Sequence, residues 1–410
     1  MSTIDDIRAG REVVGLAEAA VAEGVGVDAL AEAILAGRVA ILANRSRRGV
    51  VRPVAVGEGL RTKVNANIGA SEDASSPEEE LRKLDAAVRA GADGVMDLST
   101  GGDLVAMRRA LLALCPVPLG TVPVYEAAVR AGAAVEEMTA DDLLGVVRRQ
   151  AEEGVDFQTI HAALTREQAE SALASDRLAG IVSRGGALLA AWMVAHDAEN
   201  PLFERFDEVL EVCRRHDVTI SLGDSLRPGA LADAGDGLQT REARVLGELV
   251  RRCRDAGVQA MVEGPGHVPL HRVASQIRDL KEACDGAPLY VLGPLVVDIA
   301  PGYDHITASI GGAAAAAAGA DFLCYVTRAE HVCLPDTDDV AEGVIAARIA
   351  AHAGDIAKAI PGARDRDDAM SRARKALDWE AQYAFALDHL RPREMRRRAG
   401  AEEGACAMCG

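Results

Sequence analysis

The feature that most constrains the fold of this chain is an alternation of short apolar runs with amphipathic stretches, which begins at about residue 60 and continues to about residue 335. Such an alternation predicts parallel strands joined by crossover helices. Nine runs fit a strand, one more than a closed eight-stranded barrel holds, so at least one of them must lie outside such a barrel. The runs are Lys63–Ile68, Gly94–Leu98, Leu119–Val124, Phe157–Ile160, Gly180–Val182, Thr219–Leu222, Val258–Val262, Leu289–Leu292 and Phe322–Val326.

Polar side chains just past the ends of these runs favour a closed (β/α)8 barrel over an open doubly wound sheet. In a barrel, the carboxyl ends of all strands meet on one face, which carries the active site. An open sheet would instead gather such residues at one switch point. The polar positions follow nearly every run: Asn67, Met96–Asp97, Tyr125, His161, Ser183–Arg184, Asp224, Glu263–His267 and His331.

The rest of the chain predicts additions to this barrel. We expect an N-terminal cap of helices and short strands at 1–59, the barrel at 60–335, a helical hairpin at 336–390 and a flexible tail at 391–410. The hairpin would consist of two long helices, Asp336–Ile360 and Arg364–His389. The tail begins with the basic run Arg391–Arg398, which by default is a solvated face.

Composition narrows the classes of partner. The formal net charge of -18 argues against nucleic acid or an anionic membrane surface as the main partner. No apolar run is long enough to cross a bilayer, and the first ten residues lack the apolar core of a secretory signal. Six cysteines are scattered singly, as reduced buried thiols usually are. We therefore expect a soluble cytoplasmic protein.

Two histidines and one carboxylate form a candidate metal site. Glu263 and His267 flank a Gly-Pro-Gly turn after one apolar run, and His331 follows another. Imidazole and carboxylate groups from different strand ends suit a divalent ion that keeps an open position for substrate. The alternative is that each histidine only satisfies backbone groups of its loop.

For three shorter motifs, the residues alone do not decide between a functional and a structural role. Gly185–Gly186 after Ser183–Arg184, and Arg227 after Asp224, could present donors to a phosphate, although tight turns explain such glycines equally well. Cys406 and Cys409 form a C-x-x-C pair, which favours metal or redox chemistry.

Several longer motifs, taken in order, resemble the phosphomethylpyrimidine synthase family of thiamine biosynthesis in its short form. They are Asn65–Gly69, Glu263–His267, Gly293–Leu295, Asp298–Ile306 and the terminal Cys-Ala-Met-Cys. The resemblance implies a (β/α)8 barrel, a helical segment and a mobile tail with a 4Fe–4S cluster that binds S-adenosylmethionine. The implied reaction is the radical rearrangement of 5-aminoimidazole ribotide into hydroxymethylpyrimidine phosphate. It also implies a homodimer and an external electron donor.

The same resemblance assigns roles to individual positions. It implies that Glu263 and His161 are catalytic, that His267 and His331 bind a divalent ion such as zinc or iron, and that Cys406 and Cys409 bind the cluster. The implied substrate contacts are Asn67, Met96, Tyr125, His161, Ser183, Arg184, Gly185, Asp224, Ser225, Leu226, Arg227, Glu263 and Tyr290.

The sequence departs from the family pattern in three places. The family tail has a third cysteine, so either the sequence stops short of it, another cysteine such as Cys333 substitutes, or the cluster is absent. Ser225 stands where the family usually has glycine, and Arg328–Ala329 where it has Pro-Lys. These departures leave two alternatives open: a 5-hydroxybenzimidazole synthase on the same scaffold, and a cluster-less nucleotide-binding relative.

Overall fold

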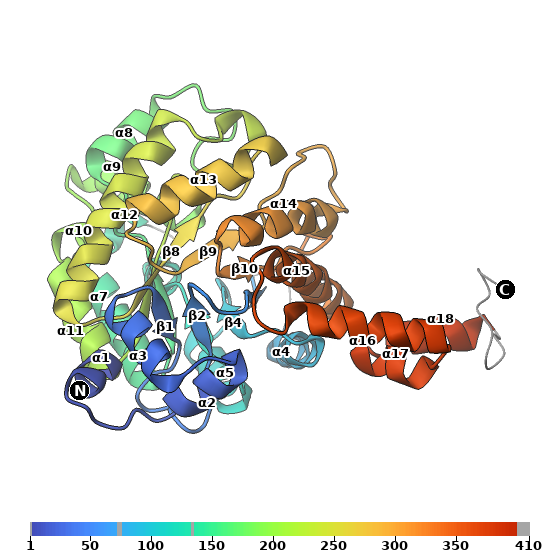
Figure 1. Ribbon diagram of the computed structural model, residues 1–410. Helices are drawn as coiled ribbons and strands as arrows, with labels where there is room; N and C mark the ends of the chain where they lie inside the picture. Colours follow the sequence, from blue (N-terminus) through green and yellow to red (C-terminus); the bar gives the residue numbers. More distant parts are fainter. Residues whose placement is uncertain (1, 72–75, 133–134, 400–410) are drawn as a thin grey trace.

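The computed structural model describes residues 2–71, 76–132 and 135–399, and it contains the predicted closed barrel. Eight parallel strands follow one another around the barrel, and β10 closes it against β3 (Figure 1). The strands are β3 Lys63–Ile68, β4 Gly94–Asp97, β5 Leu119–Thr121, β6 Phe157–Ile160, β7 Thr219–Leu222, β8 Ala260–Gly264, β9 Leu289–Leu292 and β10 Phe322–Cys324.

One of the nine predicted runs is not a strand. Residues 180–182 lie in the irregular segment between α8 and α9, where Gly180 has a φ of 64° and Ser183 caps the next helix. The prediction of a strand there was wrong, because three apolar residues cannot be told from a loop by periodicity. The run at 119–124 is also shorter than expected, since Pro123 opens helix α6 and has no N–H for a ladder.

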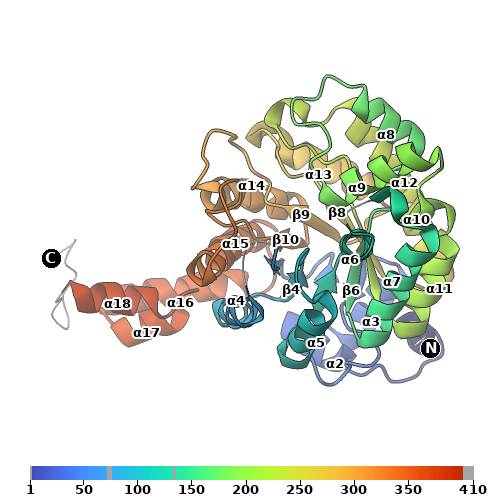
Figure 2. The ribbon, with the colours of Figure 1, turned by 180° about the vertical axis from the view of Figure 1, so that it is seen from behind.

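Helices surround the barrel on all sides (Figures 1 and 2). Helix α4 shows why these helices begin where they do: the side chain of Ser76 accepts a hydrogen bond from the backbone N–H of Glu79, with Pro77 at the first helical position. The helices up to the last barrel strand are α1 Thr3–Arg8, α2 Leu16–Glu23, α3 Val27–Leu35, α4 Pro77–Ala90, α5 Leu104–Leu114, α6 Pro123–Arg130, α7 Ala140–Glu153, α8 Arg166–Leu173, α9 Arg184–His196, α10 Pro201–Glu204, α11 Phe206–His216, α12 Gly237–Ala256, α13 Leu270–Ala283 and α14 Asp304–Ala318, with 3-10 turns at Val135–Glu137 and Leu231–Asp233.

The N-terminal segment covers the amino ends of the barrel strands. Its two short strands, β1 Val39–Ile41 and β2 Ala55–Gly57, pair in antiparallel fashion. The backbone N–H of Ile41 donates to the side chain of Gln259, just before β8, and that of Thr3 donates to Asp217, just before β7. The opposite, carboxyl face of the barrel is therefore left for the site.

Three aromatic rings fill the barrel interior beneath that face. The rings of Phe157 and Phe322 meet edge to face with centroids 6.5 Å apart, and Tyr290 lies 4.7 Å from Phe322. All three side chains are buried. Such close packing gives the residues at the strand ends rigid support from below.

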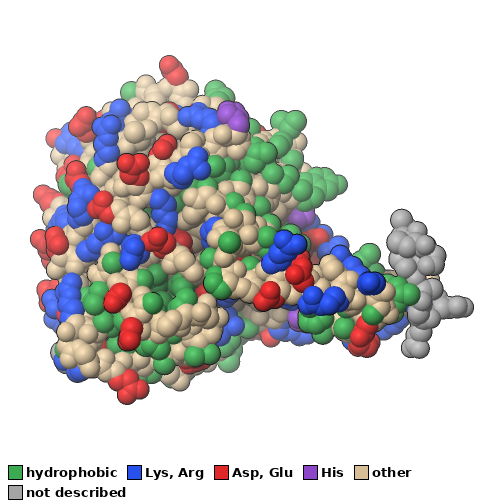
Figure 3. Space-filling model, in the orientation of Figure 1, with side chains coloured by type: hydrophobic (Ala, Val, Ile, Leu, Met, Phe, Trp, Pro, Cys, Tyr) green, Lys and Arg blue, Asp and Glu red, His purple; other side chains and the backbone are tan. Residues whose placement is uncertain are grey.

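The C-terminal helices form an arm that leaves the barrel. Helix α15 Thr337–Ala357 packs against α14 and α4, and α16 Ala363–Ala376, α17 Trp379–Phe385 and α18 Arg391–Arg398 extend outward from it (Figures 1 and 2). The predicted single helix 364–389 is broken, because Leu377 adopts a φ of 55°. Several Lys and Arg side chains lie on the surface of the arm (Figure 3), and no residue of α18 is buried. None of the described helices has the length and apolar character needed to cross a membrane.

Candidate active site

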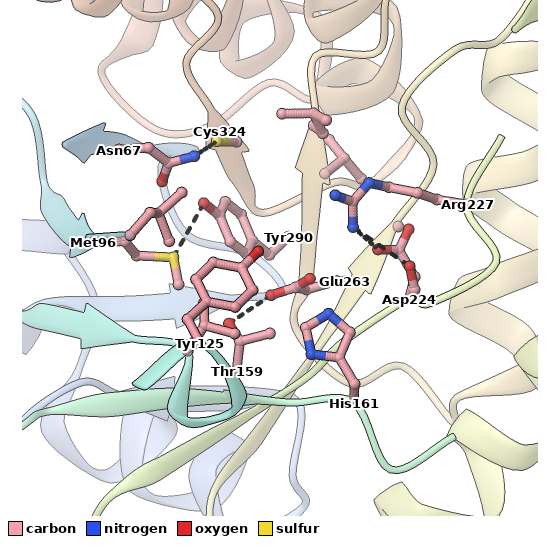
Figure 4. Close-up of a pocket in the computed structure, with 15 residues that line it drawn as sticks. Asn67, Met96, Tyr125, Thr159, His161, Asp224, Arg227, Glu263, Tyr290 and Cys324 are labelled. Carbon is pink, nitrogen blue, oxygen red and sulfur yellow. Dashed lines mark hydrogen bonds and ion pairs between the residues drawn. The ribbon is translucent and has the colours of Figure 1, made fainter. Parts of the chain in front are cut away.

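A chamber lies at the carboxyl ends of the barrel strands, and each of the eight strands contributes to it directly or through the residues that follow it (Figure 4). Eight of the predicted substrate residues line it: Asn67, Met96, Tyr125, His161, Asp224, Arg227, Glu263 and Tyr290. Seven further residues complete the lining: Leu98, Val122, Thr159, Gly264, Val291, Leu292 and Cys324.

Glu263, near the end of β8, is held by two hydroxyl groups. The Oγ1 of Thr159 donates to its Oε1 at 2.8 Å, and the Oγ of Ser221 donates to the same oxygen at 3.1 Å. Burial raises the pKa of Glu263 above its ordinary value, and the guanidinium of Arg227 and these hydroxyl groups offset only part of this rise. A carboxyl group with a raised pKa that faces a chamber suits proton transfer near neutral pH.

Asp224 and Arg227 form an ion pair on the loop after β7. The Nη1 of Arg227 donates to Oδ1 of Asp224 at 3.0 Å, whereas Oδ2 is buried and has no partner among the described residues. Burial raises the pKa of Asp224 well above its ordinary value, against the opposing effect of Arg227. An unpaired buried acceptor is costly, so this oxygen is a candidate to receive a hydrogen bond from a ligand.

His161 is an imidazole held between two glycines. A Cβ at Gly185 would overlap its ring, and one at Gly223 would come within 2.8 Å of it. The Oγ of Ser183 lies 3.2 Å from Nε2, whereas Nδ1 is buried and has no partner among the described residues. Burial, together with Arg227, lowers the pKa of His161 to about 3. The ring is therefore neutral at pH 7 and can donate or accept one hydrogen bond.

Asn67 and Tyr290 form the opposite wall of the chamber. Asn67 donates to the thiol sulfur of Cys324 at 3.0 Å, and the hydroxyl of Tyr290 accepts from Asn65 at 2.7 Å and lies 3.6 Å from the sulfur of Met96. Burial raises the pKa of Cys324 to about 12, so its thiol stays protonated. This wall is uncharged.

Five predicted substrate residues lie beside the chamber and do not line it. Ser183 caps α9, and Gly185 supports His161. Arg184 is exposed, with its guanidinium carbon 5.7 Å from the ring centre of Tyr125. Ser225 and Leu226 point their backbone N–H groups away from the chamber, toward Glu242 on α12.

His267 and His331 come together, as the metal prediction requires. Their ring centroids are 5.4 Å apart. The Nδ1 of His267 lies 2.8 Å from Oδ1 of Asp298, and the Nδ1 of His331 lies 2.9 Å from Oδ1 of Asp304. A carboxylate can only accept, so each Nδ1 carries a proton, and in the neutral form of each ring Nε2 keeps its lone pair.

This histidine pair fits a divalent ion in its donor chemistry. Metal-binding imidazoles usually donate their second N–H to a carboxylate in this way. Within the described residues, however, no group of three or more potential ligands gathers, so the pair would leave the other coordination positions open. Cys406 and Cys409, the predicted cluster ligands, lie outside the described residues.

Sequence reasoning missed the two carboxylates that hold these imidazoles. Asp298 lies in the segment between β9 and α14, and Asp304 is the first residue of α14; both belong to the Asp298–Ile306 motif of the family resemblance. Thr159 and Cys324 were missed as lining residues, although both lie within predicted strands. Their small polar side chains give no signal by themselves.

Comparisons with known proteins relate this whole chain to one family. A family model described as "Radical SAM ThiC family" matches residues 2–410. The phosphomethylpyrimidine synthase of Methanopyrus kandleri is 56% identical over 95% of this chain and 91% of its own length. That of Moorella thermoacetica is 54% identical over 100% of this chain and 96% of its own. A Yersinia pestis dihydropteroate synthase structure covers 76% of this chain and 96% of its own, at 15% identity and a TM-score of 0.43, a likeness too weak to add anything.

The family match extends over nearly the entire sequence, and relatives with more than half of their residues identical cover almost all of it. Agreement of this extent cannot come from the barrel alone, because unrelated enzymes share that architecture. This chain belongs to the Radical SAM ThiC family.

Proposed function

We propose that this chain is a phosphomethylpyrimidine synthase, a radical lyase that converts 5-aminoimidazole ribotide into 4-amino-5-hydroxymethyl-2-methylpyrimidine phosphate in thiamine biosynthesis. The observation that carries the proposal is the chamber, because eight of the substrate residues expected from the family resemblance lie together there, at or just after the ends of the barrel strands. Family membership and the name shared by the relatives support it.

In this proposal Arg227 and Arg184 bind the substrate phosphate. Arg227 is paired with Asp224 and borders the chamber, and its guanidinium offers the fork of donors that a phosphate accepts. Arg184 opens α9, whose first N–H groups can also face an anion. Ser183, Gly185 and the loop residues Ser225 and Leu226 set the positions of these groups.

The imidazole and amino groups of the substrate would meet Glu263, His161 and the uncharged wall of Asn67, Met96, Tyr125 and Tyr290. Glu263 can take or return a proton, since burial already brings its pKa upward. His161 stays neutral and offers one donor or acceptor at a fixed position. The uncharged wall excludes water from a reactive intermediate.

The proposal includes two metal groups. A 4Fe–4S cluster with S-adenosylmethionine, implied by the family and bound through Cys406 and Cys409, would supply a 5′-deoxyadenosyl radical. His267 and His331 would hold a divalent ion, zinc or iron, through their Nε2 atoms. The open positions around a two-histidine ion leave room for a substrate or cofactor group.

We also propose a cytoplasmic homodimer that receives electrons from an external donor. Five buried cysteines, none of them in a disulfide, support a reducing compartment. They are Cys115, Cys213, Cys253, Cys284 and Cys324.

The test is a product analysis of the reconstituted protein under anaerobic conditions with a chemical reductant. We expect 5′-deoxyadenosine to form only when 5-aminoimidazole ribotide is present, and the product mass to match the pyrimidine phosphate. A benzimidazole product would assign the chain to 5-hydroxybenzimidazole synthesis instead. Binding of the ribotide without 5′-deoxyadenosine would identify the cluster-less relative.

A further inference from the structure

Behind the chamber, one buried carboxylate holds the loop that carries Asp224 and Arg227. Glu242, on α12, is 1% exposed. Its Oε1 accepts from the backbone N–H of Ser225 and its Oε2 accepts from that of Leu226, both at 2.7 Å. Each oxygen therefore takes one of two consecutive N–H groups, an arrangement that fixes the loop in position and in orientation.

A buried arginine holds the same loop from the other side. The side chain of Arg177, in the segment between α8 and α9, is 3% exposed. Its Nη2 donates to the carbonyl oxygen of Leu226 at 2.8 Å, and its Nε and Nη2 pair with the carboxylate of Asp236, which caps the helix that bears Glu242. Glu242, Arg177 and Asp236 thus form a closed brace around the loop.

The loop itself is buried: Ser225 and Leu226 are both 0% exposed, and Leu226 belongs to the main hydrophobic core. A second cavity, of about 380 Å³, lies between α12 and α13, and it is lined by Glu242 as well as by Asp224 and Glu263 of the chamber. Buried backbone N–H groups need acceptors, and for Ser225 and Leu226 the acceptor is the carboxylate of Glu242. We propose that Glu242 is a positioning residue, which sets the Asp224–Arg227 loop for phosphate binding through its two backbone hydrogen bonds.

Glu242 is a titratable member of this brace, and burial makes its charged form unfavourable. Burial raises the pKa of Glu242 to about 7, against the backbone N–H groups of Leu226 and Ser225 and the charge of Arg177, which lower it. Asp224, the nearest acidic group of the loop, has a raised pKa of its own. Protonation removes one of the two acceptors, so the loop would be held by one hydrogen bond below about pH 7.

The inference rests on the proposed function for its effect on substrate, but hydrogen exchange tests the brace without substrate. We would compare the wild-type chain with Glu242→Gln and Glu242→Ala. The matched control is Glu248→Gln, the same change at an exposed position of α12. Glutamine has one acceptor oxygen, so it leaves an N–H of the loop unpaired. We expect amide exchange in the peptide 224–227 to be at least tenfold faster in both Glu242 variants and unchanged in the control.

Kinetics then separate positioning from general loss of structure. We expect KM for 5-aminoimidazole ribotide to rise about tenfold in Glu242→Gln, which corresponds to about 1.4 kcal/mol, with a smaller change in kcat. The wild-type KM should rise as the pH falls below about 7, whereas that of the variant should be high and flat.

Unchanged exchange in peptide 224–227 of Glu242→Gln would overturn the inference, as would an unchanged KM and pH profile in an active enzyme. If the wild-type chain converts no ribotide while exchange rises in the two variants, the proposed function fails and the brace stands. If Glu242→Ala does not fold, Glu242→Gln decides, because it keeps the size of the side chain.

Discussion

The imidazole rings of His267 and His331 lie with centroids 5.4 Å apart, and each ring donates its Nδ1 proton to a carboxylate from the same short segment. The two histidines come from different strand ends, yet Asp298 and Asp304 are only six positions apart. Their arrangement orients both Nε2 atoms before any ion arrives.

Asp298→Ala and Asp304→Ala should each weaken binding of Zn²⁺ by about 10- to 100-fold, the usual cost of removing a carboxylate behind a metal-binding histidine. The measurement is competition with a chromophoric chelator, which needs no turnover. Asp338→Ala, at an exposed site on α15, is the control. Equal zinc affinity in all three variants would contradict the role of the two carboxylates.

Arg227→Met should raise KM for the phosphorylated substrate by about 10- to 150-fold, because a hydrogen bond to a charged group contributes about 1.5–3 kcal/mol. The effect should be much smaller on the dephosphorylated nucleoside, which lacks the group that Arg227 binds. Arg241→Met removes an exposed arginine from α12 and serves as control. A similar loss with both substrates would show that Arg227 acts on something other than phosphate.

Asp224→Asn should stabilise the folded chain at neutral pH while it impairs activity. Burial raises the pKa of Asp224 in the folded state, so its contribution to stability is complete below the unfolded pKa of about 3.9 and is lost as the pH rises through the raised value. Asparagine cannot ionise, so the variant does not lose this stability as the pH rises. The gain in melting temperature should therefore be larger at pH 8 than at pH 5, and a gain that is independent of pH would refute this explanation.

Gly185→Ala should cost activity more than stability. The added methyl group meets the ring of His161, which must then shift away from its place between Gly185 and Gly223. Gly145→Ala makes the same change inside helix α7, where nothing lies within 4 Å of the new atom. We expect the control to gain up to about 1 kcal/mol of stability and keep full activity. If the two variants have the same kcat, the position of His161 is not critical.

The barrel and much of the chamber could be predicted from the sequence because both follow from one periodic pattern. Parallel strands place all carboxyl ends on one face, so Asn67, His161 and Glu263 converge wherever in the chain they lie. The same pattern failed at residues 180–182, where an apolar run too short to have a period forms a loop.

The residues that support the site could not be predicted in this way. Glu242 lies on an amphipathic helix, where a glutamate is read as a surface residue by default. Its burial depends on the loop after β7, which no local pattern reveals. Asp298 and Asp304 likewise act through histidines far away in the sequence.

The segment between Asp298 and Asp304 has a thermodynamic consequence. Both imidazoles are hydrogen-bonded to this segment, so an ion that binds the two rings must also stabilise the folded segment. By linkage, a change that destabilises the segment must lower the affinity for the ion by the same free energy. Removal of the ion with a chelator should therefore increase local unfolding of residues 298–304 before it affects the rest of the chain. Ion binding and the folding of this segment would then be thermodynamically coupled.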